Sequence, residues 1–332
     1  MKVILPLTLL ILIAVSSFLS GQDAHMSNYR TSANFFNPAE TGDFLGFIKV
    51  HGTLRTQYER VYEHGIAGAE VNMFSPLRKQ DWVSCGINLL FDRTGNLSYN
   101  TAGGSVQFAY HLALDKKRNN VIGLGGSFDY QKLTISGQNY RSETTITGGQ
   151  DPDLNGIANF SGTLRGINAG VNITSRFYKN SYFKAGVAAV RLNAPNYTIV
   201  GKQNDASHAT RININAAYCT PVSKVFTLEP AAFMSFSEHQ SNINLQLISG
   251  WKLSPKHSWQ IVTGLTHRLN ESVGLIAGFS SKKTYLSLSF DIITGQVSQV
   301  TQNPGALELG LYHIFYRYTR PAVKPVIFCN RL

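Results

Sequence analysis

Tyr285-Leu286-Ser287-Leu288-Ser289-Phe290-Asp291-Ile292 decides the fold, because it is the longest clean alternation of apolar and polar residues in the chain. Successive side chains of a β-strand point to opposite faces. In a strand, the two leucines, Phe290 and Ile292 therefore share one face, and the two serines and Asp291 share the other. The run predicts a strand with one apolar face and one polar face.

The same alternation recurs from Phe44 to Tyr318, and no break in it marks a domain boundary. Asn242-Ile243-Asn244-Leu245-Gln246-Leu247 and Arg211-Ile212-Asn213-Ile214-Asn215-Ala216 show it clearly. We predict about fourteen strands, an even number as in bacterial outer-membrane barrels. They lie near residues 43–59, 64–75, 81–93, 98–114, 120–135, 160–176, 181–193, 208–220, 225–238, 241–253, 257–270, 272–280, 283–294 and 306–318.

Two all-β architectures contain such strands. In a soluble sandwich the apolar face meets a second sheet, whereas in an outer-membrane barrel it meets lipid and the polar face meets the lumen. The antiparallel transmembrane barrel is favoured by polar faces rich in Asn, Gln, Thr, Ser, Gly and Arg and by aromatic residues near the strand ends. Short breaks also alternate with long ones, as in such barrels. The long breaks, Gly137–Asn159 and Ala194–Ser207, are expected outside the cell.

The amino end has the features of a secretory signal peptide over residues 1–21. Lys2 precedes the apolar stretch Val3–Val15, and small residues follow it, with cleavage expected before Gln22. No later apolar run approaches the roughly 20 residues of a membrane helix. We therefore predict an exported protein of the Gram-negative outer membrane.

Three further segments complete the predicted organisation: a leader at 22–42, the barrel at 43–318 and a short C-terminal tail at 319–332. Pro321 and Pro325 argue against another central strand in the tail, because proline cannot donate a ladder hydrogen bond.

The stretch Asn28–Gly42 of the leader is too polar for a membrane helix. Asn37-Pro38 favours extended or turn geometry, because the proline ring crowds the preceding residue. One interpretation is structural: this dipeptide fixes the leader at the barrel mouth, and Phe35 and Phe36 pack against the barrel end. The other is that the leader faces a partner protein. The candidate partner-binding residues are Tyr29, Arg30, Phe36, Asn37 and Pro38.

Composition argues against several functions. The net charge is +11, from 30 Lys and Arg against 19 Asp and Glu, yet no basic run is longer than Lys116-Lys117-Arg118, so nucleic-acid binding is not expected. Scattered surface lysines, a basic lumen or a rim facing anionic lipid would each account for the charge. Cys85, Cys219 and Cys329 lack the spacing of a metal site or a disulfide framework.

Two motifs could carry chemistry. Asp151-Pro152-Asp153-Leu154-Asn155-Gly156 matches the start of a calcium loop, but Gly162 stands where the closing Glu belongs, so a solvated turn is the preferred interpretation. His239-Gln240-Ser241-Asn242 is similar to the His-x-Ser-Asn arrangement of an outer-membrane phospholipase, with His as base and Ser as nucleophile. Ile243 replaces the expected Gly, and the motif falls at a predicted turn, so polar turn residues explain it better.

Gly123-Leu124-Gly125-Gly126 precedes no helix, so packing at the lumen wall explains its glycines better than a dinucleotide does. We expect no catalytic residue, no metal site and no cofactor.

The leader also carries a resemblance to a known family. Ser27-Asn28-Tyr29 followed by Phe36-Asn37-Pro38-Ala39-Glu40-Thr41-Gly42 resembles the start of the PorP/SprF family of type IX secretion outer-membrane proteins. Leu54-Arg55-Thr56-Gln57-Tyr58, Asp151-Pro152 and the terminal Phe328-Cys329-Asn330-Arg331-Leu332 resemble later family elements in the same order. Glu40 stands where the family has Tyr.

The resemblance implies a non-enzymatic outer-membrane barrel of the type IX secretion and gliding machinery. It implies that such a barrel binds or anchors a secreted surface protein, such as the C-terminal region of an adhesin, or subunits of the machine. Outer-membrane lipid would surround it. The polar inner face leaves a passive porin as the alternative.

Overall fold

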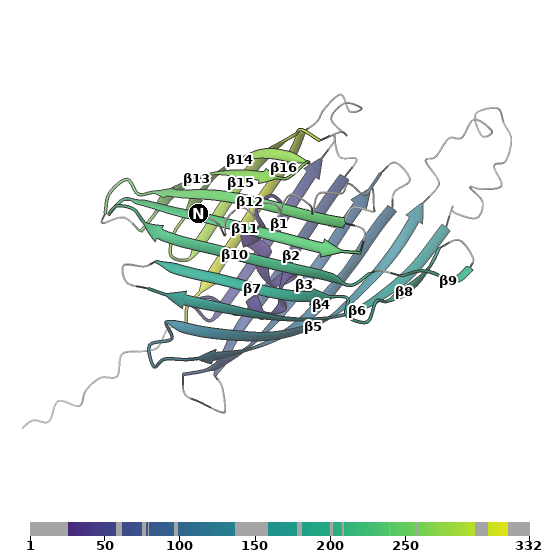
Figure 1. Cartoon of the computed structure of the whole chain (residues 1–332), viewed down its shortest axis with the longest axis horizontal. Helices are drawn as coiled ribbons and strands as arrows, with labels where there is room; N and C mark the ends of the chain where they lie inside the picture. The colour runs from purple at the N-terminus through teal and green to yellow at the C-terminus, as the bar shows by residue number, and fades with distance from the viewer. Residues whose placement is uncertain are drawn as a thin grey trace, which may run out of the picture.

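Fourteen antiparallel strands form a closed barrel (Figure 1). The computed structural model describes residues 26–57, 62–74, 78, 80–95, 99–136, 159–177, 181–199, 202–207, 209–238, 240–255, 258–295 and 305–317. The barrel strands are β1 (Ile48–Gln57), β2 (Tyr62–Phe74), β3 (Trp82–Thr94), β4 (Tyr99–Ala113), β5 (Asn120–Ser136), β6 (Asn159–Arg176), β7 (Tyr182–Val190), β10 (Arg211–Pro221), β11 (Phe226–Ser237), β12 (Gln240–Trp251), β13 (Gln260–Arg268), β14 (Ser272–Ser280), β15 (Thr284–Ile293) and β16 (Gly305–Phe315). Each coincides with one predicted strand, so the predicted fold is confirmed.

Pairing between β1 and β16 closes the barrel. Their register runs from Ile48 opposite Phe315 to Gln57 opposite Ala306. Every other neighbour pair is consecutive in sequence except β7 and β10. In the sequence between these two strands, β8 (Asn196–Ile199) and β9 (Lys202–Ser207) form a two-stranded sheet that is separate from the barrel wall. The prediction of a strand-free break at Ala194–Ser207 was therefore wrong, because β8 is only four residues long and β9 pairs with it without the apolar alternation that identified the other strands.

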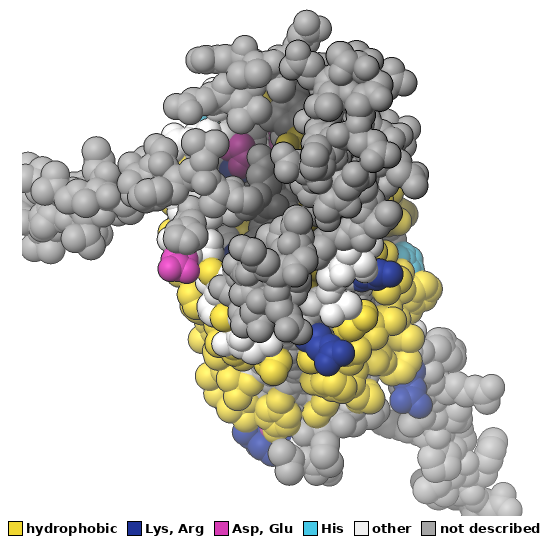
Figure 2. All heavy atoms as spheres, turned by 90° about the vertical axis from the view of Figure 1, so that its right-hand side faces the viewer, with side chains coloured by type: hydrophobic (Ala, Val, Ile, Leu, Met, Phe, Trp, Pro, Cys, Tyr) yellow, Lys and Arg dark blue, Asp and Glu magenta, His cyan; other side chains and the backbone are white. Residues whose placement is uncertain are grey.

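The two faces of the wall differ as the alternation predicts. On β15, Leu286, Leu288 and Phe290 are exposed on the outside, whereas Ser289 and Asp291 are buried inside. Figure 2 shows hydrophobic side chains over the visible part of the outer wall. This arrangement, with an apolar outer surface around a polar interior, is that of a transmembrane barrel.

The two ends of the barrel differ in the length of their connections. The termini end, where β1 begins and β16 ends, carries short connections such as those at 114–119 and 281–283. The opposite loop end carries the connections at 137–158 and 191–210. Of the predicted long break Gly137–Asn159, residues 137–158 lie outside the described residues.

Ahead of β1, the chain crosses the inside of the barrel in three short helical turns. These are η1 (Tyr29–Ser32), α2 (Ala33–Phe36) and η2 (Pro38–Glu40), drawn in purple within the ring of strands in Figure 1. We call Met26–Asp43 the plug. Among the described residues, no helix is long and apolar enough to cross a bilayer.

Candidate functional site

The plug contains all five residues that the sequence suggested for partner binding. Tyr29, Phe36, Asn37 and Pro38 are buried, and Arg30 is half-buried. Because they contact strands on opposite sides of the barrel, they lie within the lumen, deeper than the barrel end at which the sequence interpretation placed Phe35 and Phe36.

The amino end of the plug is held by carboxylates of the last two strands. The backbone N–H groups of Ser27 and Asn28 donate to the two carboxylate oxygens of Glu308, at 2.6 and 2.8 Å. The Ser27 hydroxyl donates to Asp291. Arg55 of β1 donates to Asp291 at 2.7 Å and to Glu308 at 3.3 Å, and Arg268 lies 3.7 Å from Asp291, so two cations face the two carboxylates within the lumen. We call Asp291 and Glu308 the carboxylate seat.

Uncharged side chains hold the middle of the plug. The side-chain amide of Asn34 donates to the side-chain oxygen of Gln107 at 2.9 Å, and the Gln107 amide donates to the backbone carbonyl of Asn34 at 3.0 Å. The Ser32 and Thr53 hydroxyls lie 3.0 Å apart. Such buried polar contacts stabilise a structure mainly because leaving either partner unsatisfied is costly.

A small apolar cluster fills the lumen beside these contacts. The ring of Phe233 from β11 lies 5.4 Å from the ring of Tyr29 and 5.0 Å from that of Phe36. Met26 and Ile66 complete the buried cluster, and Phe35 packs against it. The aromatic residues of the leader therefore share one cluster with Ile66 of β2 and Phe233 of β11, on opposite sides of the barrel.

Glycines in the wall make room for the Asn-Pro-Ala turn of the plug. A Cβ on Gly125 would lie less than 3.0 Å from the backbone of Pro38 and Ala39. A Cβ on Gly170 or on Gly186 would lie equally close to the side chain of Asn37. We call these three glycines the glycine seat. The lumen-wall role that the sequence suggested for Gly125 is confirmed.

Asn37 and Pro38 shape this turn together. The side-chain oxygen of Asn37 accepts the N–H of Ala39 at 3.0 Å, which caps η2. Its side-chain amide donates to the carbonyl of Val171 on β6 at 3.2 Å. Pro38 occupies the first position of η2, where its missing N–H costs nothing. The Asn-Pro pair therefore both shapes the turn and bonds it to the wall.

Ion pairs hold the carboxyl end of the plug. Lys184 of β7 lies 2.6 Å from Glu40 and 2.8 Å from Asp43, and Thr174 donates to Asp43 at 2.5 Å. Burial alone would raise the pKa of Asp43, but Lys184, Thr174 and Arg176 together hold this pKa well below its usual range. Glu40 thus has a matching cation in Lys184.

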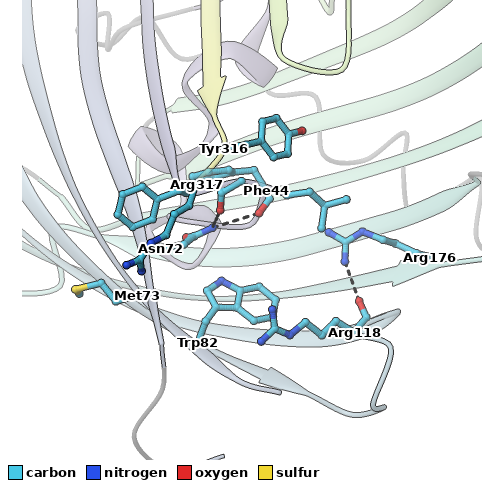
Figure 3. A pocket seen from close by; sticks show the side chains of 11 residues that line it. Phe44, Asn72, Met73, Trp82, Arg118, Arg176, Tyr316 and Arg317 are labelled. Atoms are coloured by element: carbon cyan, nitrogen blue, oxygen red, sulfur yellow. Dashed lines mark hydrogen bonds between the residues drawn. The ribbon is translucent and has the colours of Figure 1, made fainter. Parts of the chain in front are cut away.

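A cavity of about 930 Å³ lies between the plug and the termini end, and we call it the vestibule. Tyr29 and Arg30 of the plug form part of its wall, and residues of the connections after β12 and β14 line it as well. A smaller cavity of about 250 Å³ adjoins it and shares Phe44, Arg176 and Tyr316. In Figure 3 the Arg118 guanidinium lies over the Trp82 ring, 5.3 Å from its centre, and Arg176 donates to the Arg118 carbonyl.

The two chemical motifs of the sequence find little support in the described residues. Asp151–Asn155 and His239 lie outside these residues, and Ser241 is exposed near the start of β12. No three His, Cys, Asp or Glu side chains within the described part of the chain are placed to hold a metal ion.

Sequence reasoning missed the wall residues that bind the plug, above all Asp291, Glu308, Lys184 and Gln107. One signal was present for the first two: each occupies an inward position on a strand whose outward residues are apolar. A carboxylate at such a position needs a partner inside the barrel.

Solved structures share this fold. The toluene transporter TbuX of Ralstonia pickettii has a TM-score of 0.50 at 9% identity, with 86% of this chain and 94% of that chain covered. The CymD monoaromatic hydrocarbon channel also has a TM-score of 0.50 at 9% identity, with 91% and 96% covered. At these identities the likeness shows an outer-membrane barrel fold and nothing of its cargo. No curated protein sequence matches the chain significantly.

The family comparison is more specific. Residues 18–312 match the family described as type IX secretion system membrane protein PorP/SprF. This range includes the plug and all fourteen barrel strands except the last residues of β16. The chain therefore belongs to the PorP/SprF family of type IX secretion system membrane proteins.

Proposed function

We propose that this barrel is a non-enzymatic component of the type IX secretion and gliding machinery that binds or anchors a partner protein. The partner is a secreted surface protein, such as the C-terminal region of an adhesin, or another subunit of the machine. The observation that carries the proposal is the plug, which occupies the lumen and bonds to strands around the barrel. A barrel filled in this way is suited to docking at its ends.

The proposal includes an orientation. Outer-membrane barrels have short turns on the periplasmic side and longer loops outside. The short connections at the termini end favour a periplasmic position for that end and for the vestibule. Residues 1–21 would serve as the signal peptide that exports the chain.

Within the plug, the five candidate residues divide into two groups. Asn37 and Pro38 contact the glycine seat, which favours a structural role for them. Tyr29 and Arg30 both line the vestibule, but Tyr29 is buried and contacts Phe233, whereas the Arg30 side chain is 31% exposed, so Arg30 is the better placed of the two to meet a partner. Phe36 contacts Phe233 and belongs with the first group.

Substitutions in the two groups test this division. We expect Asn37→Ala to weaken barrel assembly, measured as the heat-modifiable shift on a gel, and Arg30→Ala to leave the barrel assembled while surface delivery of the partner falls. An intact barrel with lost secretion in Asn37→Ala would assign that residue to the partner instead.

Crosslinking with mass spectrometry on intact outer membranes tests the function itself. A tagged chain should be crosslinked to a secreted surface protein or to machine subunits, and a deletion strain should lose surface display of that protein. Normal display in the deletion strain, together with no crosslinked partner, would contradict the proposal.

The alternative, a passive porin, requires an open lumen. Single-channel recording of the purified chain in planar bilayers separates the two functions. We expect no steady conductance from the plugged barrel, and a stable open channel in the unmodified protein would favour the porin.

A further inference from the structure

The charges that line the vestibule are unbalanced. Six cationic side chains line it, whereas Glu40, Asp43 and Glu229 are its only acidic residues among those described. The cations are Arg30, Lys49, Arg176, Lys184, Lys252 and Lys282. All three acidic residues already pair with a cation from this set, and Lys49 pairs with the buried Glu70 at 2.6 Å, so the surplus charge is positive and is carried by Lys252 and Lys282.

The ion pairs are also oriented in one direction. The Arg30 side chain is 31% exposed while its partner Glu229 is 8% exposed. Lys184 is 23% exposed, whereas its partners Glu40 and Asp43 are 3% and 1% exposed. In each pair the carboxylate is buried against the plug or the wall, and the cation faces the cavity. A ligand entering the vestibule therefore meets positive charge.

Lysines extend this charge to the rim. Lys252 follows β12, and Lys282 lies in the connection between β14 and β15, both at the termini end. The adjoining small cavity adds Arg118 and Arg317. Cavities lined by one sign of charge concentrate ligands of the opposite sign and speed their association.

Apolar side chains stand between these cations. Leu45 is 66% exposed and Tyr316 is 48% exposed, and both line the vestibule together with Phe44 and Tyr312. The Lys49 ammonium lies over the rings of Phe44 and Tyr312, at 5.4 and 5.9 Å from their centres. Arg and Tyr are the residues most often found at the energetic centre of protein interfaces. The lining thus fits a ligand with both carboxylates and apolar groups.

Size and position narrow the choice of ligand. A cavity of about 930 Å³ is far larger than an inorganic anion needs. A phospholipid headgroup fits poorly, because its acyl chains stay outside the wall whereas Arg30 and Lys184 lie inside the ring of strands. A peptide segment can enter from the termini end and meet both kinds of side chain.

We propose that the vestibule binds an acidic peptide segment, with aromatic or aliphatic residues among its carboxylates, that belongs to a partner protein on the termini side. This inference rests on the proposed docking function and adds the chemistry of the partner. Its carboxylates pair with Lys252, Lys282 and the exposed faces of Arg30 and Lys184, and its apolar groups contact Leu45 and Tyr316.

Fluorescence anisotropy with the purified full-length chain tests the inference. The probe is a fluorescein-labelled synthetic peptide in which Glu alternates with Phe or Leu, and the control peptide carries Lys in place of Glu. The acidic peptide should bind and the basic peptide should not, and added salt should weaken the binding. Equal binding of the two peptides would overturn the inference.

Charge reversal at the rim sharpens the test. Lys252→Glu with Lys282→Glu should weaken binding of the acidic peptide by about tenfold or more. The matched control is Lys116→Glu with Lys117→Glu, which makes the same charge change at exposed positions of the same end that do not line the vestibule. Binding in the control should stay within about twofold of the unmodified chain. An equal loss of peptide affinity in both double variants would show that the overall charge of the protein, and not the vestibule, governs binding, which would contradict the inference.

Competition distinguishes the other anions. Displacement of the peptide by inorganic phosphate or by phosphatidylglycerol vesicles would assign the vestibule to that anion and overturn the peptide inference.

Secretion assays separate the vestibule inference from the proposed docking function. If the deletion strain loses surface display while the purified chain does not discriminate between the peptides, the vestibule inference fails and the docking function stands. If the deletion strain secretes normally, the docking function fails.

Discussion

The plug is held at its two seats by opposite means. At the carboxylate seat, Glu308 accepts hydrogen bonds from the backbone N–H groups of Ser27 and Asn28, and Asp291 accepts one from the Ser27 hydroxyl. At the glycine seat, Gly125, Gly170 and Gly186 have no side chain, which leaves room for the turn at Asn37 and Pro38. The first seat therefore depends on hydrogen bonds from side chains, and the second depends on free space at the wall. Truncating a side chain therefore damages the first, and enlarging one damages the second.

The largest effect is expected from Gly125→Val at the glycine seat. The new side chain would overlap backbone atoms of Pro38 and Ala39, which cannot move aside as the end of a flexible side chain can. We expect the plug to leave the lumen and a steady conductance to appear in planar bilayers.

Gly126→Val is the matched control for this substitution. The nearest atom to its added Cβ would be 3.6 Å away, which is an ordinary contact, so the barrel should stay closed. Conductance in both variants, or in neither, would show that the glycine seat does not hold the plug in place.

The next largest effect is expected from Asp291→Asn at the carboxylate seat. Asp291 lies 2.7 Å from Arg55 and 3.7 Å from Arg268, and breaking a buried ion pair typically costs about 3–5 kcal/mol. The midpoint of urea unfolding in detergent should fall accordingly. Combining it with Arg55→Gln should cost less than the sum of the two single variants, because the two side chains interact directly. Strict additivity would contradict the pairing.

A smaller effect is expected between the two seats, from Asn34→Ala. This change removes the bond from the Asn34 side-chain amide to the Gln107 side-chain oxygen, whereas the bond from the Gln107 amide to the Asn34 backbone carbonyl stays, so the cost is that of one hydrogen bond, about 0.5–1.5 kcal/mol. The unfolding midpoint measures it. Combining it with Gln107→Leu should cost less than the sum of the two single variants, because both remove the same Asn34–Gln107 bond, and strict additivity would contradict that bond.

The smallest effect is expected from pH, through Asp43. Its pKa in the folded chain is lowered, mainly because Lys184 and Thr174 outweigh the opposing effect of burial. A lowered carboxyl pKa stabilises the folded state above the unfolded value of about 3.9, and this stabilisation is lost as pH falls below it. Stability should therefore be insensitive to Asp43 between pH 7 and 5 and should decline below about pH 4. Asp43→Asn should remove this part of the decline, and an unchanged pH profile would contradict the role of the ion pair.

The strands could be predicted from sequence because lipid and lumen impose different chemistry on alternate residues. Leu288 and Ser289 differ for this reason alone. The β8–β9 hairpin could not be predicted in this way, since β8 has only four residues and β9 lacks the apolar alternation of the barrel strands.

The position of the plug was only partly predictable. Asn37-Pro38 indicated a turn, and the glycines around Gly125 indicated close packing at the lumen wall. The two carboxylates to which Ser27 donates, however, lie in β15 and β16, far along the chain, and no local pattern links them. The arrangement of the vestibule was hidden as well, because the scattered lysines come together only when the barrel closes.

The bond between Ser27 and Glu308 has a consequence for how the barrel is built. Ser27 and Asn28, near the first described residues, bond to Glu308 of β16, the last described strand, and the same strand closes the wall against β1. A chain synthesised only as far as β15 thus lacks both the closing pair of strands and the Glu308 contacts of the plug. The same strand therefore completes two steps of assembly, closure of the wall and binding of the plug at Ser27 and Asn28.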